Sequence, residues 1–273
     1  METDFLIVIP SKSRAKELFN DTYSFVKHSK YPFKIFVEPS QYENYLKYIP
    51  KKDLVVLDKD NQGLCYAKLF IQKYLQKRNI LYCMKLDDDL VNVRVPETRG
   101  DRTIKVERSF RVKTAFDNLI NNSIKLLKDF TDIKAIQIDY GNKLIDYDET
   151  KTFTTINSRL LSSYIVTTDY LFPHNEHIFA DVFEDFDVFM RIINDGYYTV
   201  RYGLTGFDYR PVGLNKGGHQ DFNRTKACEN AKKRMEVWYP NLAWKQVDKI
   251  WKFEPDISKT IKGISIHAKT KIS

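Results

Sequence analysis

The fold of this chain is decided by an apolar run that ends in three carboxylates, Asn79-Ile80-Leu81-Tyr82-Cys83-Met84-Lys85-Leu86-Asp87-Asp88-Asp89-Leu90. The run predicts a buried strand, and the three carboxylates place negative charge at its end. Such charge is costly to bury unless a cation neutralises it. Alternate side chains of a strand share one face, so we expect Asp87 and Asp89 to point together and Asp88 to point away. A solvated acidic turn or a helix cap is the open alternative.

Three further apolar runs precede this strand, and helical stretches separate them. Strands are predicted at 5–9, 34–37, 53–57 and 80–86, with helices at 15–28, 41–48 and 64–76. Strands that alternate with helices form a parallel, doubly wound sheet, whose ligands bind beyond the carboxyl ends of its strands. We therefore predict an α/β fold with a mostly parallel central sheet flanked by helices.

The second half of the chain has weaker signals. Helices are predicted at 113–130, 185–194 and 224–238, strands at 134–138 and 197–202, and an extended segment at 160–167. Residues 91–105 are expected to form a loop and 140–155 a polar stretch, while Gly196 should end a helix. We predict a core at 1–215, with a donor half at about 1–90 and an acceptor half at about 110–215. A basic helical extension at 216–273 is expected to pack on it.

The amino-acid composition limits the classes of protein to which this chain can belong. The 273 residues are 42% hydrophobic and 14% aromatic, which is enough for a packed core and argues against general disorder. No run approaches the ~20 apolar residues that span a bilayer. Cys65, Cys83 and Cys228 are too few and too scattered for a disulfide framework. We expect a reducing cytoplasm, which would be the host cytoplasm if the protein is viral.

The net charge of +8 is unevenly distributed along the chain. Residues 216–273 hold 13 Lys and Arg against 6 Asp and Glu, and residues 94–113 hold seven against three. Clustered basic charge favours a polyanion, although a solvated tail and an exposed loop would also explain it. The residues predicted to contact nucleic acid are Arg94, Arg99, Arg102, Lys105, Lys232, Lys233 and Arg234.

Two loops that follow predicted strands have residues suited to a nucleotide. Pro10 ends the first strand, and Lys12 and Arg14 stand where a helix begins, which suits a diphosphate. Asn61 can hydrogen-bond a nucleotide or sugar, and Gly63 permits a close backbone approach. A serine cap with basic neighbours explains the first loop equally well, and an ordinary turn explains the second.

Two later segments add candidate catalytic groups. Glu184, Asp185 and Asp187 fall at the start of a predicted helix, where a carboxylate can act as a general base toward an acceptor hydroxyl. Asp187 could instead pair with Arg191, which lies four residues later on the same helix face. The loop Asn215-Lys216-Gly217-Gly218-His219-Gln220 contains one of only five histidines, which could complete a metal site or be structural.

Together these pieces resemble the nucleotide-sugar glycosyltransferases of GT-A fold, over roughly residues 4–220. The resemblance identifies Asp87-Asp88-Asp89 with the DxD motif of that family. It implies that Asp87 and Asp89 bind a divalent Mn²⁺ or Mg²⁺ ion and contact the donor, a UDP-sugar for example. It also implies that Asp88 contacts the ribose or sugar, that His219 is a third metal ligand, and that Lys216 contacts the donor.

The resemblance also assigns the chemistry of transfer. It implies an inverting enzyme in which Asp185 is the base and Glu184 steadies the acceptor. The glycine pair that often precedes the acidic motif is replaced by Asp181-Val182-Phe183, so the base remains open between Glu184, Asp185 and Asp187.

The sequence indicates less about the acceptor than about the donor. Aromatic residues alternate with basic residues near the C-terminus, a pattern that suits a phosphate backbone with stacked bases. Similar small enzymes, in phages among other places, imply a hydroxymethylated base in DNA, such as hydroxymethylcytosine, as the acceptor. Two alternatives stay open. The first is a transferase of surface polysaccharide or lipid-linked glycan synthesis, and the second is a non-catalytic nucleic-acid-binding module.

Overall fold

The apolar run at residues 80–86 forms strand β4 (Tyr82–Lys85), which lies inside the central sheet. The computed structural model describes residues 4–94, 110–140, 152–160, 162–172, 184–210, 224–239, 244–246 and 253–255. The first half of the chain contains β1 (Phe5–Pro10), α1 (Ala15–Asn20), α2 (Thr22–Val26), β2 (Phe33–Val37), α3 (Tyr42–Leu46), β3 (Leu54–Val56), α4 (Gly63–Gln76) and β4.

The second half begins with a strand that leads into the longest helix. Its elements are β5 (Leu90–Arg94), α5 (Phe110–Asp129), β6 (Ile133–Tyr140), β7 (Phe153–Ile156), β8 (Tyr164–Thr167), α6 (Glu184–Asn194), β9 (Tyr198–Tyr209), α7 (Arg224–Trp238), β10 (Trp244–Gln246) and β11 (Phe253–Pro255). Strands β10 and β11 form a separate antiparallel pair.

The main sheet has the strand order β3-β2-β1-β4-β8-β6-β9-β5, with β7 paired to β9. Strands β1, β2, β3 and β4 are mutually parallel, as the alternation of strands and helices predicted. Strand β8 runs antiparallel between β4 and β6, and β9 pairs parallel with β6. The predicted α/β fold with a mostly parallel sheet is therefore confirmed.

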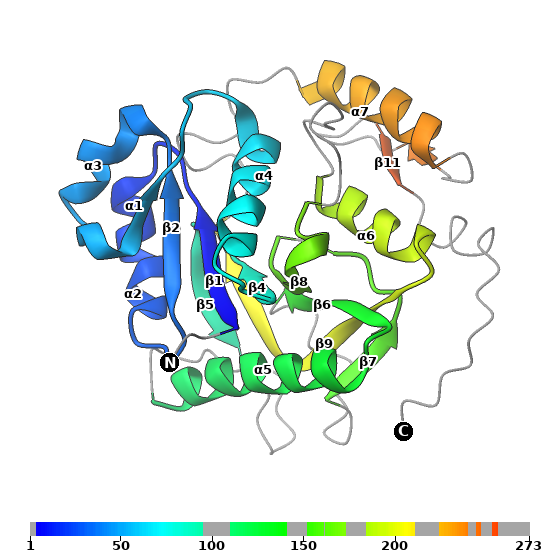
Figure 1. Ribbon diagram of the computed structural model, residues 1–273, viewed down its shortest axis with the longest axis horizontal. Helices are drawn as coiled ribbons and strands as arrows, with labels where there is room; N and C mark the ends of the chain where they lie inside the picture. Colours follow the sequence, from blue (N-terminus) through cyan, green and yellow to red (C-terminus); the bar gives the residue numbers. More distant parts are fainter. Residues whose placement is uncertain are drawn as a thin grey trace.

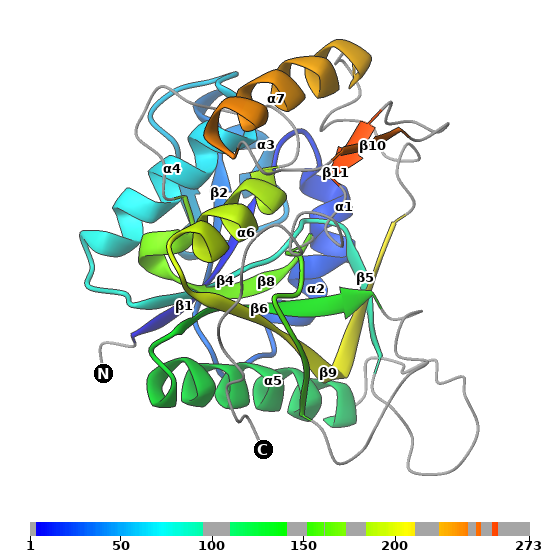
Figure 2. The ribbon, with the colours of Figure 1, turned by 90° about the vertical axis from the view of Figure 1, so that its right-hand side faces the viewer.

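Helices cover both faces of this sheet (Figures 1 and 2). Alternate residues of β1 divide between two cores: Ile7 packs in the core that includes residues of α1, α2 and α5, and Val8 in the core that includes residues of α4 and α6. Figure 2 shows α5 on one side of the sheet, with α4, α6 and α7 on the other. This alternation explains why β1 reads as a continuous apolar run.

Helix α7 packs on the second core through one face. Met235 and Tyr239 are buried there, whereas Val237 is 78% exposed. The predicted helix at 224–238 is confirmed, and its described end lies against the core. Among the described residues, no helix combines the length and the apolar character needed to cross a membrane.

The predicted stop at Gly196 is confirmed in detail. Its backbone has φ +84°, a region that favours glycine. The N–H of Gly196 donates to the carbonyl of Ile193 at 3.0 Å, and that of Tyr197 donates to Ile192 at 2.9 Å. These two bonds satisfy the last carbonyls of α6, as in a Schellman motif.

Three predicted elements need correction. The helix expected at 15–28 is two short helices, because the chain turns at Asp21 (φ −98°, ψ −103°). The loop expected from residue 91 begins instead as strand β5, and the strand expected at 197–202 continues to Tyr209. These last two differences have one cause, since β5 and the end of β9 pair with each other. Strand β7 overlaps the end of the polar stretch predicted at 140–155.

Candidate active site

The three carboxylates Asp87, Asp88 and Asp89 lie in a turn just after β4, and a buried threonine holds this turn. The Thr22 hydroxyl donates to the carbonyl of Asp87 at 2.9 Å and accepts from the N–H of Leu90 at 2.9 Å. From the other side, the N–H of Arg210 donates to the carbonyl of Asp89 at 3.1 Å. The turn is thus fixed by α2 and by the end of β9.

We expect Thr22→Val to lower the free energy of unfolding by about 2 to 4 kcal/mol. The change takes this partner from the buried N–H of Leu90 and from the partly buried carbonyl of Asp87, and each such loss costs about 1–3 kcal/mol. Urea denaturation followed by circular dichroism would measure the loss. Thr22→Ser keeps the hydroxyl and should stay within about 1 kcal/mol of the native protein. Equal stability of the valine and serine variants would contradict the role of this hydroxyl.

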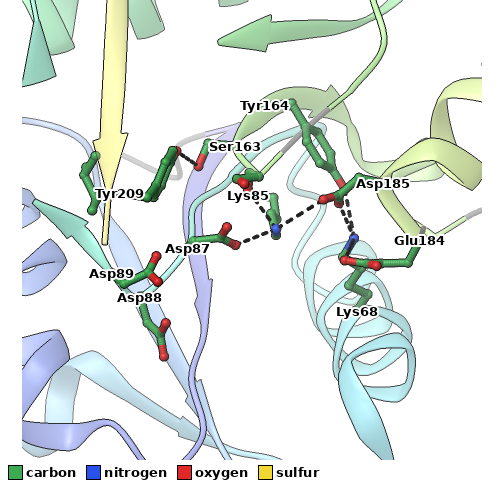
Figure 3. A network of polar contacts seen from close by, with 12 residues as sticks. Lys68, Lys85, Asp87, Asp88, Asp89, Ser163, Tyr164, Glu184, Asp185 and Tyr209 are labelled. Carbon is green, nitrogen blue, oxygen red and sulfur yellow. Dashed lines mark hydrogen bonds and ion pairs between the residues drawn. The ribbon is translucent and has the colours of Figure 1, made fainter. Parts of the chain in front are cut away.

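The expectation that Asp88 points away from Asp89 is wrong. Asp88 and Asp89 both face Arg14, whose Nη1 lies 2.9 Å from Asp88 and 3.5 Å from Asp89. Asp87 instead faces Lys85, as Figure 3 shows. The physical reason is that β4 ends at Lys85, so strand alternation does not extend into the turn.

Asp88 is the most firmly held of the three carboxylates. It accepts a hydrogen bond of 2.6 Å from the Ser11 hydroxyl, which lies 2.7 Å from the Tyr45 hydroxyl. Burial raises the pKa of Tyr45 to about 12, so this phenol remains a donor at neutral pH. Burial also raises the pKa of Asp88, while Arg14 and Ser11 oppose that shift. The predicted donor contact Asp88 is therefore tied to the loop after β1.

Asp89 is the carboxylate whose charge the protein balances least. Burial, then the neighbouring Asp87 and Asp88, raise the pKa of Asp89 to about 7, and Arg14 offsets this only in part. Carboxylate oxygens are the donors that Mg²⁺ and Mn²⁺ prefer, so the donor set fits a hard cation. Within the described part of the chain, however, no three His, Cys, Asp or Glu residues are grouped to hold a metal ion.

The predicted donor residues Lys12 and Asn61 meet at the ends of β1 and β3. Lys12 Nζ lies 2.6 Å from Asn61 Oδ1 and 3.0 Å from each carboxylate oxygen of Glu38. Glu38 also accepts from the N–H of Asn61 at 2.9 Å. Gly63 begins α4 with φ +84° and has no atom within 4 Å of an added Cβ, so it leaves open space. Pro10 ends β1 beside this group.

One lysine joins the strand-end carboxylates to the predicted base. Lys85 Nζ lies 2.6 Å from Asp87 and 3.7 Å from Asp185, and it donates to the carbonyl of Ser162 at 2.7 Å (Figure 3). Burial and the Asp185 charge raise the pKa of Asp87, and Lys85 lowers it. The first helical turn of α6 and the end of β4 therefore belong to one site.

Asp185 is held by a second lysine from α4. Lys68 Nζ lies 2.6 Å from Asp185 and 3.5 Å from Glu184. Burial by itself would raise the pKa of Asp185, but Lys68 and Lys85 outweigh it and hold that pKa below its ordinary value. Asp185 is accordingly an ionised carboxylate at neutral pH.

Asp187 lies elsewhere. It is buried in the core, and its Oδ1 accepts a hydrogen bond of 2.6 Å from the Tyr239 hydroxyl. Burial and the Asp187 charge raise the pKa of Tyr239, which keeps the phenol protonated. Of the three acidic residues predicted at this helix start, Glu184 and Asp185 are brought to the strand-end carboxylates, whereas Asp187 contacts the residue after α7.

The remaining predicted residues divide into two groups. Arg94 pairs with Asp208 at 2.6 Å, Lys232 pairs with Glu236 at 3.2 Å, and Lys233 and Arg234 are exposed on α7. The predicted residues Lys216, His219, Arg99, Arg102 and Lys105 lie outside the described residues.

Sequence reasoning did not find Lys68 and Lys85, although both stand out in retrospect. Each interrupts an apolar pattern: Lys85 is the last residue of a buried strand, and Lys68 shares the buried face of α4 with Ile71. A lysine at a core position needs a buried counter-charge, and that requirement was a usable signal. Ser11 and Thr22 had no comparable signal, because small hydroxyl residues near helix starts usually act as caps.

Comparison with known proteins identifies the family. The family model described as TET-Associated Glycosyltransferase matches residues 5–208. No curated protein matches the chain. Among solved structures, a cytidylyltransferase from Leptospira borgpetersenii serovar Hardjo-bovis (strain JB197) is 12% identical with a TM-score of 0.41, covering 74% of this chain and 76% of that one.

Two further structures have comparable scores. Staphylococcus aureus TarS 1-349 is 12% identical with a TM-score of 0.42, over 74% of this chain and 59% of that one. A putative nucleotide-diphospho-sugar transferase from Desulfovibrio desulfuricans G20 is 6% identical with a TM-score of 0.42, over 73% and 79%. The family assignment rests on the sequence match, which spans the described site from β1 to β9. The chain belongs to the TET-Associated Glycosyltransferase family and is a glycosyltransferase.

Proposed function

We propose that this glycosyltransferase moves a sugar from a nucleotide-sugar donor to the hydroxyl group of a hydroxymethylated base in DNA, with inversion and with a divalent metal ion. The observation that carries the proposal is the position of Lys85, which contacts both Asp87 and Asp185. This contact brings the proposed donor carboxylates and the proposed base into one site, as a transfer between two substrates requires.

The donor half of the proposal uses the loop after β1 and the turn after β4. Lys12 lies beside Asn61, and Arg14 lies beside Asp88 and Asp89. Both cations would face the donor's diphosphate. Asp87, Asp89 and His219 would hold the metal ion. When bound, such an ion would neutralise charge on the departing diphosphate.

The acceptor half uses the start of α6. Asp185 would take the proton of the acceptor hydroxyl while that oxygen bonds to the anomeric carbon of the sugar. The bond from that carbon to the diphosphate breaks, and the nucleoside diphosphate leaves with the electron pair. Attack from the face opposite the leaving group inverts the anomeric centre. Glu184, 3.5 Å from Lys68, would orient the acceptor.

The DNA acceptor is supported by charge and by the family. Basic residues concentrate in residues 216–273, and Lys233 and Arg234 are exposed on α7. The description of the family associates the family with TET. A base in DNA must carry a hydroxyl group before a sugar can be transferred to that base. A base inside a duplex would have to be extruded to reach Asp185.

The proposal is tested by product analysis. The protein would be incubated with Mn²⁺, a panel of nucleotide-sugars and duplex DNA containing hydroxymethylcytosine. The DNA would then be digested to nucleosides for mass spectrometry. We expect a glycosylated nucleoside with one donor, and none from the same duplex carrying unmodified cytosine.

Parallel reactions distinguish the acceptors. Polyprenyl phosphate and a polysaccharide fragment would be offered with the same donors. Glycosylation of either of these, with the DNA unchanged, would overturn the DNA acceptor while keeping the transferase.

The basic face of α7 yields a prediction about DNA binding. Neutralising Lys232, Lys233 and Arg234 to glutamine should flatten the slope of log affinity against log salt by about 2 to 3, because each phosphate contact contributes about 0.9. Fluorescence anisotropy with labelled duplex DNA at several salt concentrations would measure the slope.

A matched variant controls for net charge. Lys47, Lys51 and Lys52 are exposed around the end of α3, and their change to glutamine removes the same charge from another surface. An unaltered slope in the α7 variant, or equal flattening in both variants, would move the DNA contact away from α7.

A further inference from the structure

Lys68 is a buried lysine that has no role in the proposed transfer reaction as described above. Its side chain has no exposed surface, although it projects from α4 in the core that covers one face of the sheet. An ammonium ion in such a place is costly unless it is paired and hydrogen-bonded. Its counter-charge is Asp185, 2.6 Å away at the start of α6 (Figure 3).

The position of this ammonium is fixed by three acceptors. Besides Asp185, Lys68 Nζ lies 3.3 Å from the hydroxyl of Tyr164 and 3.5 Å from Glu184. Tyr164 is fully buried at the start of β8. An ammonium group has three N–H donors, so these contacts from two other elements use its full capacity.

The carboxylate of Asp185 is therefore held from two sides by different parts of the fold. Lys68 approaches from α4, and Lys85 approaches from β4 at 3.7 Å. A helix-terminal aspartate without such partners would sample several rotamers. A reacting group displaced by about 1 Å can lose about 100-fold in rate.

We propose that Lys68 is a positioning residue for glycosyl transfer, which fixes the Asp185 carboxylate where the acceptor hydroxyl must approach. The inference rests on the proposed role of Asp185 as the base. Lys68 itself contacts neither substrate; it acts through Asp185. Lys85 is the second, weaker support and links the same carboxylate to the donor side.

The first test is a double-mutant cycle on kcat. Lys68→Met keeps the length of the buried side chain without its charge, and we expect kcat to fall about 100-fold with the donor KM unchanged. In an Asp185→Asn background the same change should lower kcat by less than about threefold, because the group that Lys68 positions is already lost. Equal losses in both backgrounds would overturn the proposal.

The rate should be followed both as transfer to hydroxymethylated DNA and as hydrolysis of the nucleotide-sugar. Hydrolysis needs no DNA, so a failure of the DNA acceptor and a failure of Lys68 are distinguishable. Lys68→Arg keeps the charge and should retain more activity than Lys68→Met. Lys73→Met, an exposed lysine on the same helix, should behave as the native protein.

A stability cycle tests the pair without any catalysis. Lys68→Met leaves Asp185 with one ammonium partner fewer and should lower the thermal midpoint, whereas adding Asp185→Asn should restore part of the loss. The double variant also provides a folded protein if the single variant is too unstable. Additive losses in stability would show that the two residues are not coupled, which would also overturn the proposal.

Discussion

Asp185→Asn is expected to lower kcat by roughly 10²- to 10⁴-fold, the range that a positioned general base contributes. Asparagine keeps the size of the side chain and can still accept a hydrogen bond from Lys68, so the site should remain folded. Donor affinity should be intact, because the donor residues lie at the ends of β1 and β4. Single-turnover kinetics and calorimetry with a nucleoside diphosphate would separate the two quantities.

Asp187→Asn is the informative comparison. Asp187 accepts a hydrogen bond from Tyr239 in the core, and asparagine replaces this charged acceptor with a weaker neutral one. The unfolding midpoint should therefore fall, while kcat should fall less than in the Asp185 variant. If kcat falls further in the Asp187 variant than in the Asp185 variant, the base is misassigned. Glu184→Gln should lie between them, since Glu184 shares Lys68 at the longer distance of 3.5 Å.

Asp89→Ala should abolish the gain in nucleoside diphosphate affinity that Mn²⁺ provides. Of the three strand-end carboxylates, Asp89 has the pKa raised to about 7 by burial and by its acidic neighbours, so its charge is the one left for an added cation to balance. We expect a loss of more than about 100-fold, since even outer-shell partners of a metal are worth 10- to 100-fold. Calorimetric titration of UDP with and without Mn²⁺ measures the effect.

Two controls belong with this prediction. A chelator should weaken UDP binding to the native protein and leave the Asp89 variant unchanged. Asp129→Ala removes an exposed carboxylate at the end of α5 and should have no effect. Unchanged binding of UDP with Mn²⁺ in the Asp89 variant would remove this carboxylate from the metal site.

The first four strands were predictable because local signals agree there. Each apolar run is bounded by a turn, helices separate the four runs, and buried parallel strands show both faces as apolar. The same reasoning located the loops after β1 and β3, the turn after β4, and the start of α6. Strand β5 was missed because its stability comes from pairing with β9, which is distant in sequence.

Details of the site depended on tertiary contacts that a sequence does not display. The direction of Asp87, Asp88 and Asp89 depends on where β4 ends and on Thr22, which holds the turn. The distinction between Asp185 and Asp187 depends on which one meets a lysine and which one meets Tyr239. Both residues lie near the start of one helix, so helical periodicity did not separate them.

The ion pairs between the end of β9 and residues near the carboxylate turn have a consequence for synthesis on the ribosome. Asp21 binds Arg210 in two hydrogen bonds across 189 positions of the chain, and Arg94 binds Asp208 across 114. Strands β1 to β4 can pair as soon as they emerge from the ribosome. The contacts that Asp21 and Arg94 make can form only after β9 has been synthesised. Contacts this far apart in sequence form slowly. We therefore expect nascent chains that end before residue 208 to contain paired strands β1 to β4 without the ion pairs that Asp208 and Arg210 form.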